Sequence, residues 1–274
     1  MRTRTNKVAS DIRMIVASHK AYEMPQDRMY LPVQVGAAGK TDIEGFVRDD
    51  SGDQISRKNP TYCELTGLYW AWKNLDADAI GLAHYRRHFS KKSRSYRKKH
   101  GVFASVLSFD EAKTLLSQYD MVVPKKRKYY IETLYSHYAH TFEASHLDVT
   151  REIIAEKYPA YVEDVDAVYR QRYGYMFNMF LLKRDDLNEY CSWLFDVLEE
   201  LERRIPTEGM STFEARFYGR VSEILFNVWL RRRMAEGATV AEVPVVSTEP
   251  VNWFKKGFAF LAAKFGGVKY KESF

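Results

Sequence analysis

The fold is decided by residues 59–89, which read NPTYCELTGLYWAWKNLDADAIGLAHYRRHF. Pro60 suits the first turn of a helix, and apolar side chains recur at helical spacing up to Asn74. After a polar turn, residues 79–83 form a short apolar run that predicts a buried strand. A helix that leads into a buried strand is typical of an α/β domain.

The same alternation extends in both directions along the chain. Residues 11–18, DIRMIVAS, predict a first buried strand, and further strands are expected at 30–35, 119–124 and 175–182. Helices are expected at 59–74, 108–116, 187–205 and 220–234, and residues 129–170 are expected to be mainly helical. The order predicts a mostly parallel central sheet with a helical C-terminal part. Without an internal repeat or a long linker, one domain is the economical interpretation.

Composition and charge narrow the class of protein. Of 274 residues, 46% are hydrophobic and 15% aromatic, which indicates a core-forming globular protein and excludes a disordered chain. The formal net charge is +6. The basic residues are clustered, mainly at 86–99, 125–128, 231–233 and the C-terminal tail. Such clusters bind phosphates, whether of nucleic acid, a nucleotide diphosphate or an anionic lipid surface.

The cysteines and the hydropathy pattern indicate a compartment. Cys63 and Cys191 stand apart with no CxxC or Cys/His spacing, which predicts buried free thiols in a reducing compartment. No apolar run reaches the roughly eighteen residues that a membrane-spanning helix needs. We therefore expect a cytoplasmic protein.

The strongest candidate site follows the predicted strands. Ligands of open α/β sheets bind at the carboxyl ends of the strands. His19 and Lys20 follow the first strand, and the candidate ligand-binding residues after the strand at 79–83 are His84, Tyr85, Arg86 and Arg87. Guanidinium groups bind a diphosphate through paired hydrogen bonds. The structural alternative is an exposed basic loop.

These stretches resemble a family of capsular and exopolysaccharide biosynthesis proteins, long described as a domain of unknown function, whose members are galactofuranosyltransferase-like. The resemblance rests on residues 59–74, 78–89, 119–130, 173–205 and 216–230, in that order. It implies a glycosyltransferase-A-like, Rossmann-like catalytic domain over residues 1–252. It also implies a UDP-sugar donor and inversion at the anomeric carbon.

The resemblance implies an enzyme that moves a sugar, galactofuranose or galactose, to a lipid-linked glycan acceptor of a bacterial surface polysaccharide. Two other classes stay open: a basic nucleic-acid-binding protein and a non-catalytic scaffold of a polysaccharide assembly complex. The chain has no recognisable RNA-binding signature and its basic groups fall at separate places, so nucleic acid is not an expected partner.

The resemblance also raises the question of a metal. Many enzymes of that fold carry a DxD metal site, and Asp76 and Asp78 match its letters. They precede the strand at 79–83 and would lie at its wrong end, so Asp78 is interpreted as a turn residue. His84, Tyr85 and Arg86 occupy the expected DxD position, which argues against a divalent cation. Mn²⁺ or Mg²⁺ held by His84 with another side chain stays the alternative.

An inverting transfer needs a carboxylate that deprotonates the attacking hydroxyl. Glu223, in GRVSE at a helix start, is the preferred base; its structural alternative is a helix N-terminal glutamate favoured by the macrodipole. Asp185 is the second choice, with helix capping as the alternative. Glu64, on an otherwise apolar helix, either bonds the donor sugar or pairs with Arg86 or Arg87 in a buried network.

Three further residues complete the candidate substrate-binding set: Lys125, Asn178 and Arg220. Lys125 belongs to the run 125–128, which either clamps the pyrophosphate of an acceptor or forms a solvated turn. The three histidines at positions 137, 140 and 146 are expected to be solvated or to face substrate, since no carboxylate completes a recognisable metal set.

The C-terminal tail, residues 253–274, mixes aromatic residues with lysines and resembles an interfacial amphipathic segment. It predicts peripheral association with the inner face of the plasma membrane, where a lipid-linked acceptor would lie. A tail helix packed on the domain is the alternative.

Overall fold

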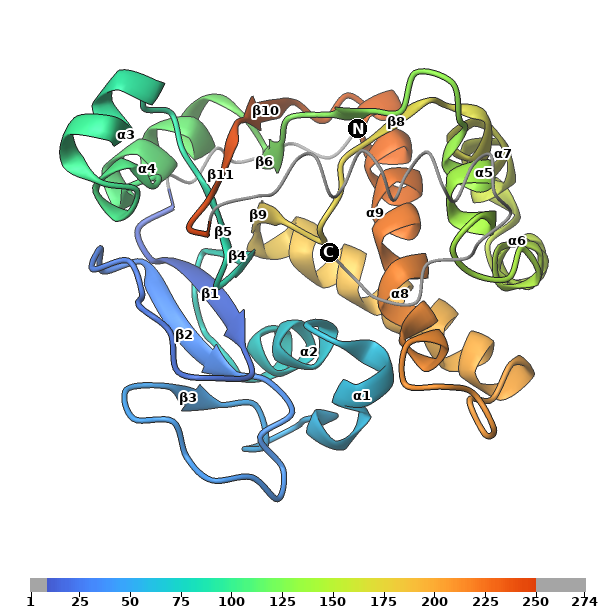
Figure 1. Ribbon diagram of the computed structural model, residues 1–274. Coiled ribbons are helices and arrows are strands. Elements are labelled where there is room, and N and C mark those ends of the chain that lie inside the picture. Colours follow the sequence, from blue (N-terminus) through green and yellow to red (C-terminus); the bar gives the residue numbers. More distant parts are fainter. Residues whose placement is uncertain (1–8, 250–274) are drawn as a thin grey trace.

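The computed structural model describes residues 9–249, which fold around one central β-sheet (Figure 1). Its strands are β1 (Ile12–Ser18), β2 (Tyr30–Gln34), β3 (Val47–Arg48), β4 (Ala79–His84), β5 (Arg87–Phe89), β6 (Met121–Pro124), β9 (Phe180–Lys183), β10 (Val240–Val243) and β11 (Val245–Ser247). A separate two-stranded ribbon joins β7 (Arg127–Lys128) to β8 (Tyr173–Gly174).

The α-helices are α1 (Asn59–Tyr62), α2 (Leu65–Asn74), α3 (Arg94–His100), α4 (Phe109–Gln118), α5 (Leu134–Ala139), α6 (Ser145–Lys157), α7 (Val162–Arg170), α8 (Arg184–Arg204) and α9 (Phe217–Ala235). Short 3₁₀ turns occupy Ser56–Lys58, Phe103–Ser105, Pro159–Tyr161 and Glu214–Arg216. Between residues 9 and 249, none of these helices has the length and apolar character needed to cross a bilayer.

The sheet is mostly parallel, in the order β10-β6-β9-β4-β1-β2-β3. β1 lies parallel to β2 on one side and to β4 on the other. The chain therefore reverses its winding direction at β1, which in an α/β sheet opens a crevice beyond the carboxyl ends of the strands. β9 is antiparallel to both of its neighbours, β4 and β6. The predicted α/β fold with a mostly parallel sheet is confirmed.

Each face of the sheet is covered, because side chains of successive strand residues point to opposite sides. Ile15 and Leu82 face the larger core, which contains apolar residues of α2, α8 and α9. Met14 and Val16 face a second core that includes Leu115 and other residues of α4. Helices α5, α6 and α7 gather beside α9 at one end of the molecule (Figure 1).

Gly81 lets β4 lie in the middle of the sheet. A Cβ atom at this position would come within 2.6 Å of the side chain of Met14 and 2.7 Å of the carbonyl oxygen of Phe180. A side chain would therefore collide with both neighbouring strands, and glycine is the residue that permits this close approach.

Two predicted boundaries were wrong. The helix expected over 59–74 is divided into α1 and α2 at Cys63, whose φ is +53°. The strand expected over 175–182 begins only at Phe180, because Phe177 and Asn178 adopt left-handed backbone conformations that a strand excludes. The helix α3 and the short strands β3, β5, β7, β8, β10 and β11 were not predicted. The tail at 253–274 lies outside the described residues.

Candidate active site

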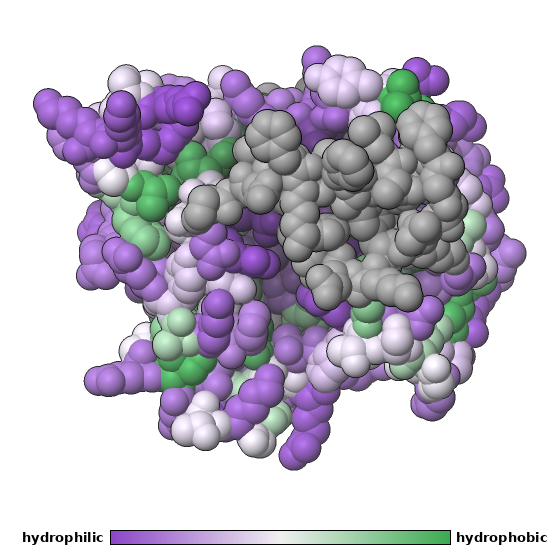
Figure 2. Space-filling model, viewed as in Figure 1, coloured by the Kyte–Doolittle hydropathy of each residue, from purple (hydrophilic) through white to green (hydrophobic). Residues whose placement is uncertain are grey.

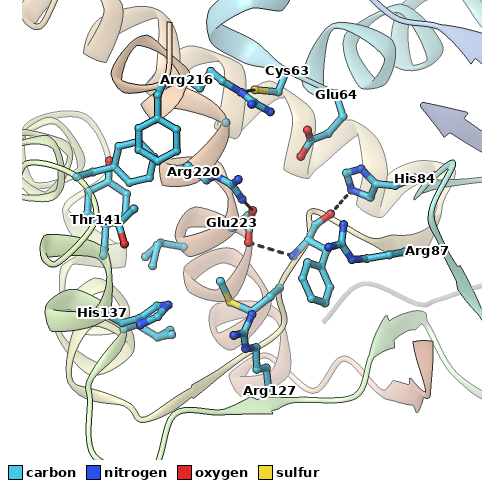
Figure 3. Close-up of a pocket in the computed structure, with 18 of the residues that line it drawn as sticks. Cys63, Glu64, His84, Arg87, Arg127, His137, Thr141, Arg216, Arg220 and Glu223 are labelled. Atoms are coloured by element: carbon cyan, nitrogen blue, oxygen red, sulfur yellow. Dashed lines mark hydrogen bonds and ion pairs between the residues drawn. The ribbon is translucent and has the colours of Figure 1, made fainter. Parts of the chain in front are cut away.

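A pocket of about 310 Å³ opens at the carboxyl edge of the sheet (Figure 3). His84, the last residue of β4, lines it and pairs in the sheet with Ala17 of β1. The opposite walls come from α9, from α5 and from the segment that precedes β9. The pocket thus occupies the crevice that the strand order predicts.

The wall has a charged part and an apolar part. The charged and polar residues include Glu64, His84, Arg86, Arg87, Arg127, His137, Arg216, Arg220 and Glu223. The apolar and aromatic residues include Leu134, Tyr138, Phe142, Met176, Phe177, Phe213 and Ile224. Such a surface suits a ligand with one anionic part and one part that packs on rings.

Helix α9 and the 3₁₀ turn before it bring two cations and a carboxylate to the pocket. Arg220 and Glu223 of α9 are three residues apart, a spacing that aligns side chains along a helix, and Arg216 ends the 3₁₀ turn directly before α9. Nη1 of Arg220 lies 3.0 Å from Oε1 of Glu223, which is only 6% exposed. Burial lowers the pKa of Arg220, but Glu223 and Glu64 outweigh burial and raise that pKa above its ordinary value. Arg220 therefore stays charged beside the carboxylate.

The turn before β9 connects the walls of the pocket. The backbone N–H of Phe177 donates to Glu223 over 3.1 Å, and Nε2 of His84 donates to the carbonyl oxygen of Phe177 over 2.5 Å. Phe177 and Asn178 have φ of +77° and +50°. Consecutive left-handed residues are strained, and such strain is retained where surrounding contacts hold it in place.

Asn178 is buried and makes three side-chain hydrogen bonds. Its amide donates to Glu64 over 2.7 Å and to the carbonyl oxygen of Gly219 over 3.1 Å, and its oxygen accepts from Ser222. Within residues 9–249, Glu64 forms no ion pair with an arginine, so the buried network expected between Glu64 and Arg86 or Arg87 is absent. Asn178 supports Glu64 and does not line the pocket.

Arg86 and Arg87 both line the pocket, from the turn between β4 and β5. The guanidinium of Arg87 lies 4.5 Å from the ring centre of Phe177 and has no carboxylate partner or hydrogen bond among the described residues. Burial and the nearby charge of Arg86 lower the pKa of Arg87. Arg86 lies 3.6 Å from Glu249, and both side chains are about two-fifths exposed. Arg87 is thus a half-buried cation that an anionic ligand would neutralise.

The histidines behave differently from one another. Nδ1 of His137 and Nδ1 of His140 lie 2.9 and 2.8 Å from the carboxylate of Glu132. Burial raises the pKa of Glu132, but these hydrogen bonds outweigh it, and the pKa falls below its ordinary value. His137 lines the pocket, whereas His146 is buried against Phe217 and shares a hydrogen bond with Tyr138. The expectation of a solvated or substrate-facing residue is wrong for His146.

Three predicted residues lie at the carboxyl edge but outside the pocket wall. His19 and Lys20 are exposed after β1. The ring of Tyr85 belongs to the second core and lies 5.6 Å from the ring of His19. Residues before and after Tyr85 face the pocket, so the alternation of side chains directs Tyr85 to the other face.

Lys125 and Asp185 lie away from the pocket. Lys125 is exposed, and its backbone N–H donates to the carbonyl oxygen of Val243. Asp185 follows β9, which runs antiparallel to β4, so it lies at the amino end of β4 and not at the carboxyl edge. The placement of Asp185 as a second catalytic carboxylate is therefore wrong.

The residues considered as metal ligands make other contacts. Asp78 accepts hydrogen bonds from the backbone and the hydroxyl of Ser10 and from the backbone of Asp11, which agrees with its interpretation as a turn residue. Over residues 9–249, no group of three His, Cys, Asp or Glu side chains has the arrangement of a metal site. His84, the residue considered as a ligand, bonds the Phe177 carbonyl.

Sequence reasoning missed several lining residues. Arg216 precedes Arg220 by one helical turn, and this spacing is the signal that identifies it. Its Nε lies 3.3 Å from Sγ of Cys63, which is half-buried and lines the pocket, whereas Cys191 is buried as expected. The stacked rings of Phe142 and Phe213, 5.1 Å apart, come from separate segments that no local pattern links.

Comparisons with known proteins agree with this architecture. Residues 13–234 match the family described as Domain of unknown function (DUF4422). No curated protein matches the chain significantly. Among solved structures, the chain is similar to the apo structure of the WbbM bifunctional glycosyltransferase, with 28% sequence identity and a TM-score of 0.79 over 88% of this chain. The chain spans 46% of that protein, about half its length.

Proposed function

The chain belongs to the DUF4422 family, and from this premise we propose that it is a glycosyltransferase that moves a sugar from a UDP-sugar to a lipid-linked glycan acceptor. The likeness to WbbM supports a glycosyltransferase role. The donor sugar in this proposal is galactofuranose or galactose, and the product belongs to a bacterial surface polysaccharide. The site of action is the inner face of the plasma membrane.

One observation carries the proposal: a half-buried arginine without an anionic partner among the described residues faces the pocket at the switch point of the sheet. Partial burial of an unpaired charge is unfavourable, so Arg87 favours a bound anion. A nucleoside diphosphate supplies two phosphates, and Arg86 lies next to Arg87 in the wall. Fixed cations also stabilise the charge that develops on the departing diphosphate.

In the proposed step, the oxygen of an acceptor hydroxyl forms a bond to the anomeric carbon of the donor. The bond from that carbon to the diphosphate oxygen breaks, and its electron pair stays on the diphosphate. The proton of the hydroxyl passes to the carboxylate of Glu223. Arg220 and the Phe177 N–H orient that carboxylate toward the pocket.

The apolar wall has a complementary role. The C–H faces of sugar rings pack on aromatic rings, and the stacked pair of Phe142 and Phe213 offers such a surface together with Tyr138. We assign this wall to the sugars, and the arginine side to the diphosphate.

The test is calorimetric titration with UDP and a panel of UDP-sugars, with Mn²⁺ and with a chelator. We expect UDP to bind and Arg87→Ala to bind it at least about tenfold more weakly, since hydrogen bonds to charged groups contribute about 1.5–3 kcal/mol. Arg170→Ala is the control, because Arg170 is exposed on α7 outside the pocket. Equal UDP affinity for Arg87→Ala and the unmodified chain would refute the proposed diphosphate site.

The other two classes give different results. A nucleic-acid-binding protein would retain RNA at low salt and show no binding of a sugar nucleotide. A scaffold without catalytic function would show no effect of Glu223→Gln on polysaccharide assembly.

A further inference from the structure

We propose that the segment Lys-Lys-Arg-Lys-Tyr-Tyr-Ile at residues 125–131, here named the basic–aromatic loop, inserts its tip into the headgroup region of an anionic membrane. It joins β6 to α5 and contains β7. The surface is separate from the C-terminal tail and was considered from the sequence only as a clamp or a solvated turn.

The tip of the loop exposes two neighbouring apolar side chains. Tyr130 is 76% exposed and Ile131 is 60% exposed, the highest values among the large hydrophobic residues of the described chain. Tyr173, on the partner strand β8, is 38% exposed. In Figure 2, a small hydrophobic area lies among hydrophilic residues at the upper edge, and in Figure 1 the green segment that leads into α5 runs along the same edge. Adjacent exposed tyrosine and isoleucine side chains are costly in water and favourable at a lipid interface.

The base of the loop is cationic. Lys125 and Lys128 are exposed and have no carboxylate partner in the part of the chain that the structure describes. Lys126 lies 3.2 Å from Glu242, and Arg127 lies 5.2 Å from the ring centre of Tyr129. An apolar tip above unpaired cations is the pattern of a segment that binds anionic headgroups and places its apolar side chains below them.

The backbone holds the tip in its exposed position. β7 pairs with β8, and the side chain of Arg172 donates to the carbonyl oxygen of Tyr130 over 3.3 Å. Tyr130 has a φ of +58°, so the chain turns sharply at the tip. Because the loop is ordered before it meets a membrane, less conformational entropy is lost on binding.

The same loop also forms part of the pocket. Arg127 and Tyr129 line the pocket from the segment whose next residues are the exposed tip. If the tip lies in the headgroup region, Arg127 lies close to headgroup depth. A diphosphate carried on a lipid would reach the pocket there with its hydrocarbon chain still in the bilayer. This last step rests on the proposed function, whereas membrane binding itself does not.

A second exposed apolar residue provides a matched control. Met234 is 43% exposed and follows three arginines on α9. Those arginines are paired with carboxylates, among them Arg231 with Asp164 and Arg233 with Asp186. The cations beside Met234 are thus neutralised by carboxylates, whereas two of the lysines in the basic–aromatic loop have no such partner among the described residues.

The test is flotation of the full chain with phosphatidylcholine vesicles, with and without phosphatidylglycerol. We expect binding only with phosphatidylglycerol. Tyr130→Asn combined with Ile131→Ser is expected to weaken it about tenfold, since asparagine tolerates the left-handed backbone at position 130. Lys128→Gln is expected to weaken binding about fivefold, and Met234→Ser to leave it unchanged.

Equal partitioning of the Tyr130/Ile131 variant and the unmodified chain would overturn the proposal. So would binding that phosphatidylglycerol does not enhance, or absence of vesicle binding, which would point to a protein partner at the loop. UDP affinity in solution is measured in parallel and is expected to be equal in all these variants, since none of these residues lines the pocket. Loss of UDP binding in the unmodified chain would count against the glycosyltransferase function and leave the membrane result standing.

Discussion

The side-chain amide of Asn178 donates a 2.7 Å hydrogen bond to Oε1 of Glu64, a residue 114 positions earlier in the chain. The bond joins the turn before β9 to the start of α2. Since Asn178 also bonds the Gly219 carbonyl, one buried side chain holds three walls of the pocket in register.

Two substitutions of Asn178 separate its hydrogen bonds from its backbone conformation. Asn178→Gly keeps the φ of +50° without strain but removes the side-chain bonds, and is expected to lower the free energy of unfolding by about 2–3 kcal/mol. Asn178→Ala is expected to lose about 1 kcal/mol more, because alanine resists the left-handed region. Urea denaturation measures both, and equal losses would show that the backbone conformation is not strained.

Arg87→Met is expected to separate stability from binding. Replacing a half-buried guanidinium without a partner by an apolar chain of similar length should raise the free energy of unfolding by about 1 kcal/mol. UDP affinity should fall about thirtyfold. Arg86→Met is the comparison and should show smaller changes, because the side chain of Arg86 is about two-fifths exposed and lies 3.6 Å from Glu249. A less stable Arg87→Met protein would indicate a structural function for this arginine.

Glu223→Gln is expected to reduce turnover about a hundredfold or more while UDP affinity is largely retained. The amide keeps the shape of the side chain but accepts no proton from the acceptor. Turnover is measured as UDP release in the presence of acceptor. Glu208→Gln, an exposed change outside the pocket, should leave turnover unaltered. Full activity of Glu223→Gln would exclude Glu223 as the base.

His88 is expected to make the protein sensitive to acid. It is fully buried between the rings of Tyr30 and Phe103, and burial lowers its pKa from 6.5 to about 4. Below pH 6.5 the unfolded chain takes up a proton that the folded chain refuses until about pH 4. The difference in proton uptake lowers the free energy of unfolding as the pH falls from 6.5 to about 4, by about 3 kcal/mol in total.

His88→Leu removes this titration while keeping an apolar side chain in the core. Denaturation curves of both proteins between pH 7 and pH 4 are compared, and the difference between their slopes isolates His88. Parallel slopes would show that this histidine titrates alike in the folded and unfolded chain.

The sequence predicted the strands and the charged edge well because both are local. Periodicity identified β1 and β4, and the run after β4 indicated Arg86 and Arg87, which both line the pocket. Nothing local reveals the direction of a strand, and the antiparallel β9 is the reason that Asp185 was placed at the wrong edge. The break at Cys63 was also hidden, because no local pattern favours a φ of +53° at a cysteine; this residue packs closely against Gly219 of α9.

The apolar part of the pocket wall could not be predicted from the sequence, because it too depends on the tertiary arrangement. Phe142 and Phe213 stack across segments that are far apart in the chain. Aromatic residues fill cores as often as they line sites, and only the tertiary arrangement distinguishes the two.

The walls of the pocket begin with Cys63 in the first third of the chain and end with Ile224 in α9. During synthesis, β1 to β4 leave the ribosome long before α9 does, so the nascent chain at first lacks the part of the pocket wall that α9 supplies. Arg87 then lies in water, not in a pocket, and the proposed nucleotide ligand has no complete site to bind. The complete pocket wall can form only after α9 has been synthesised, which makes ligand-induced thermal protection a readout of the correct folding of these distant segments.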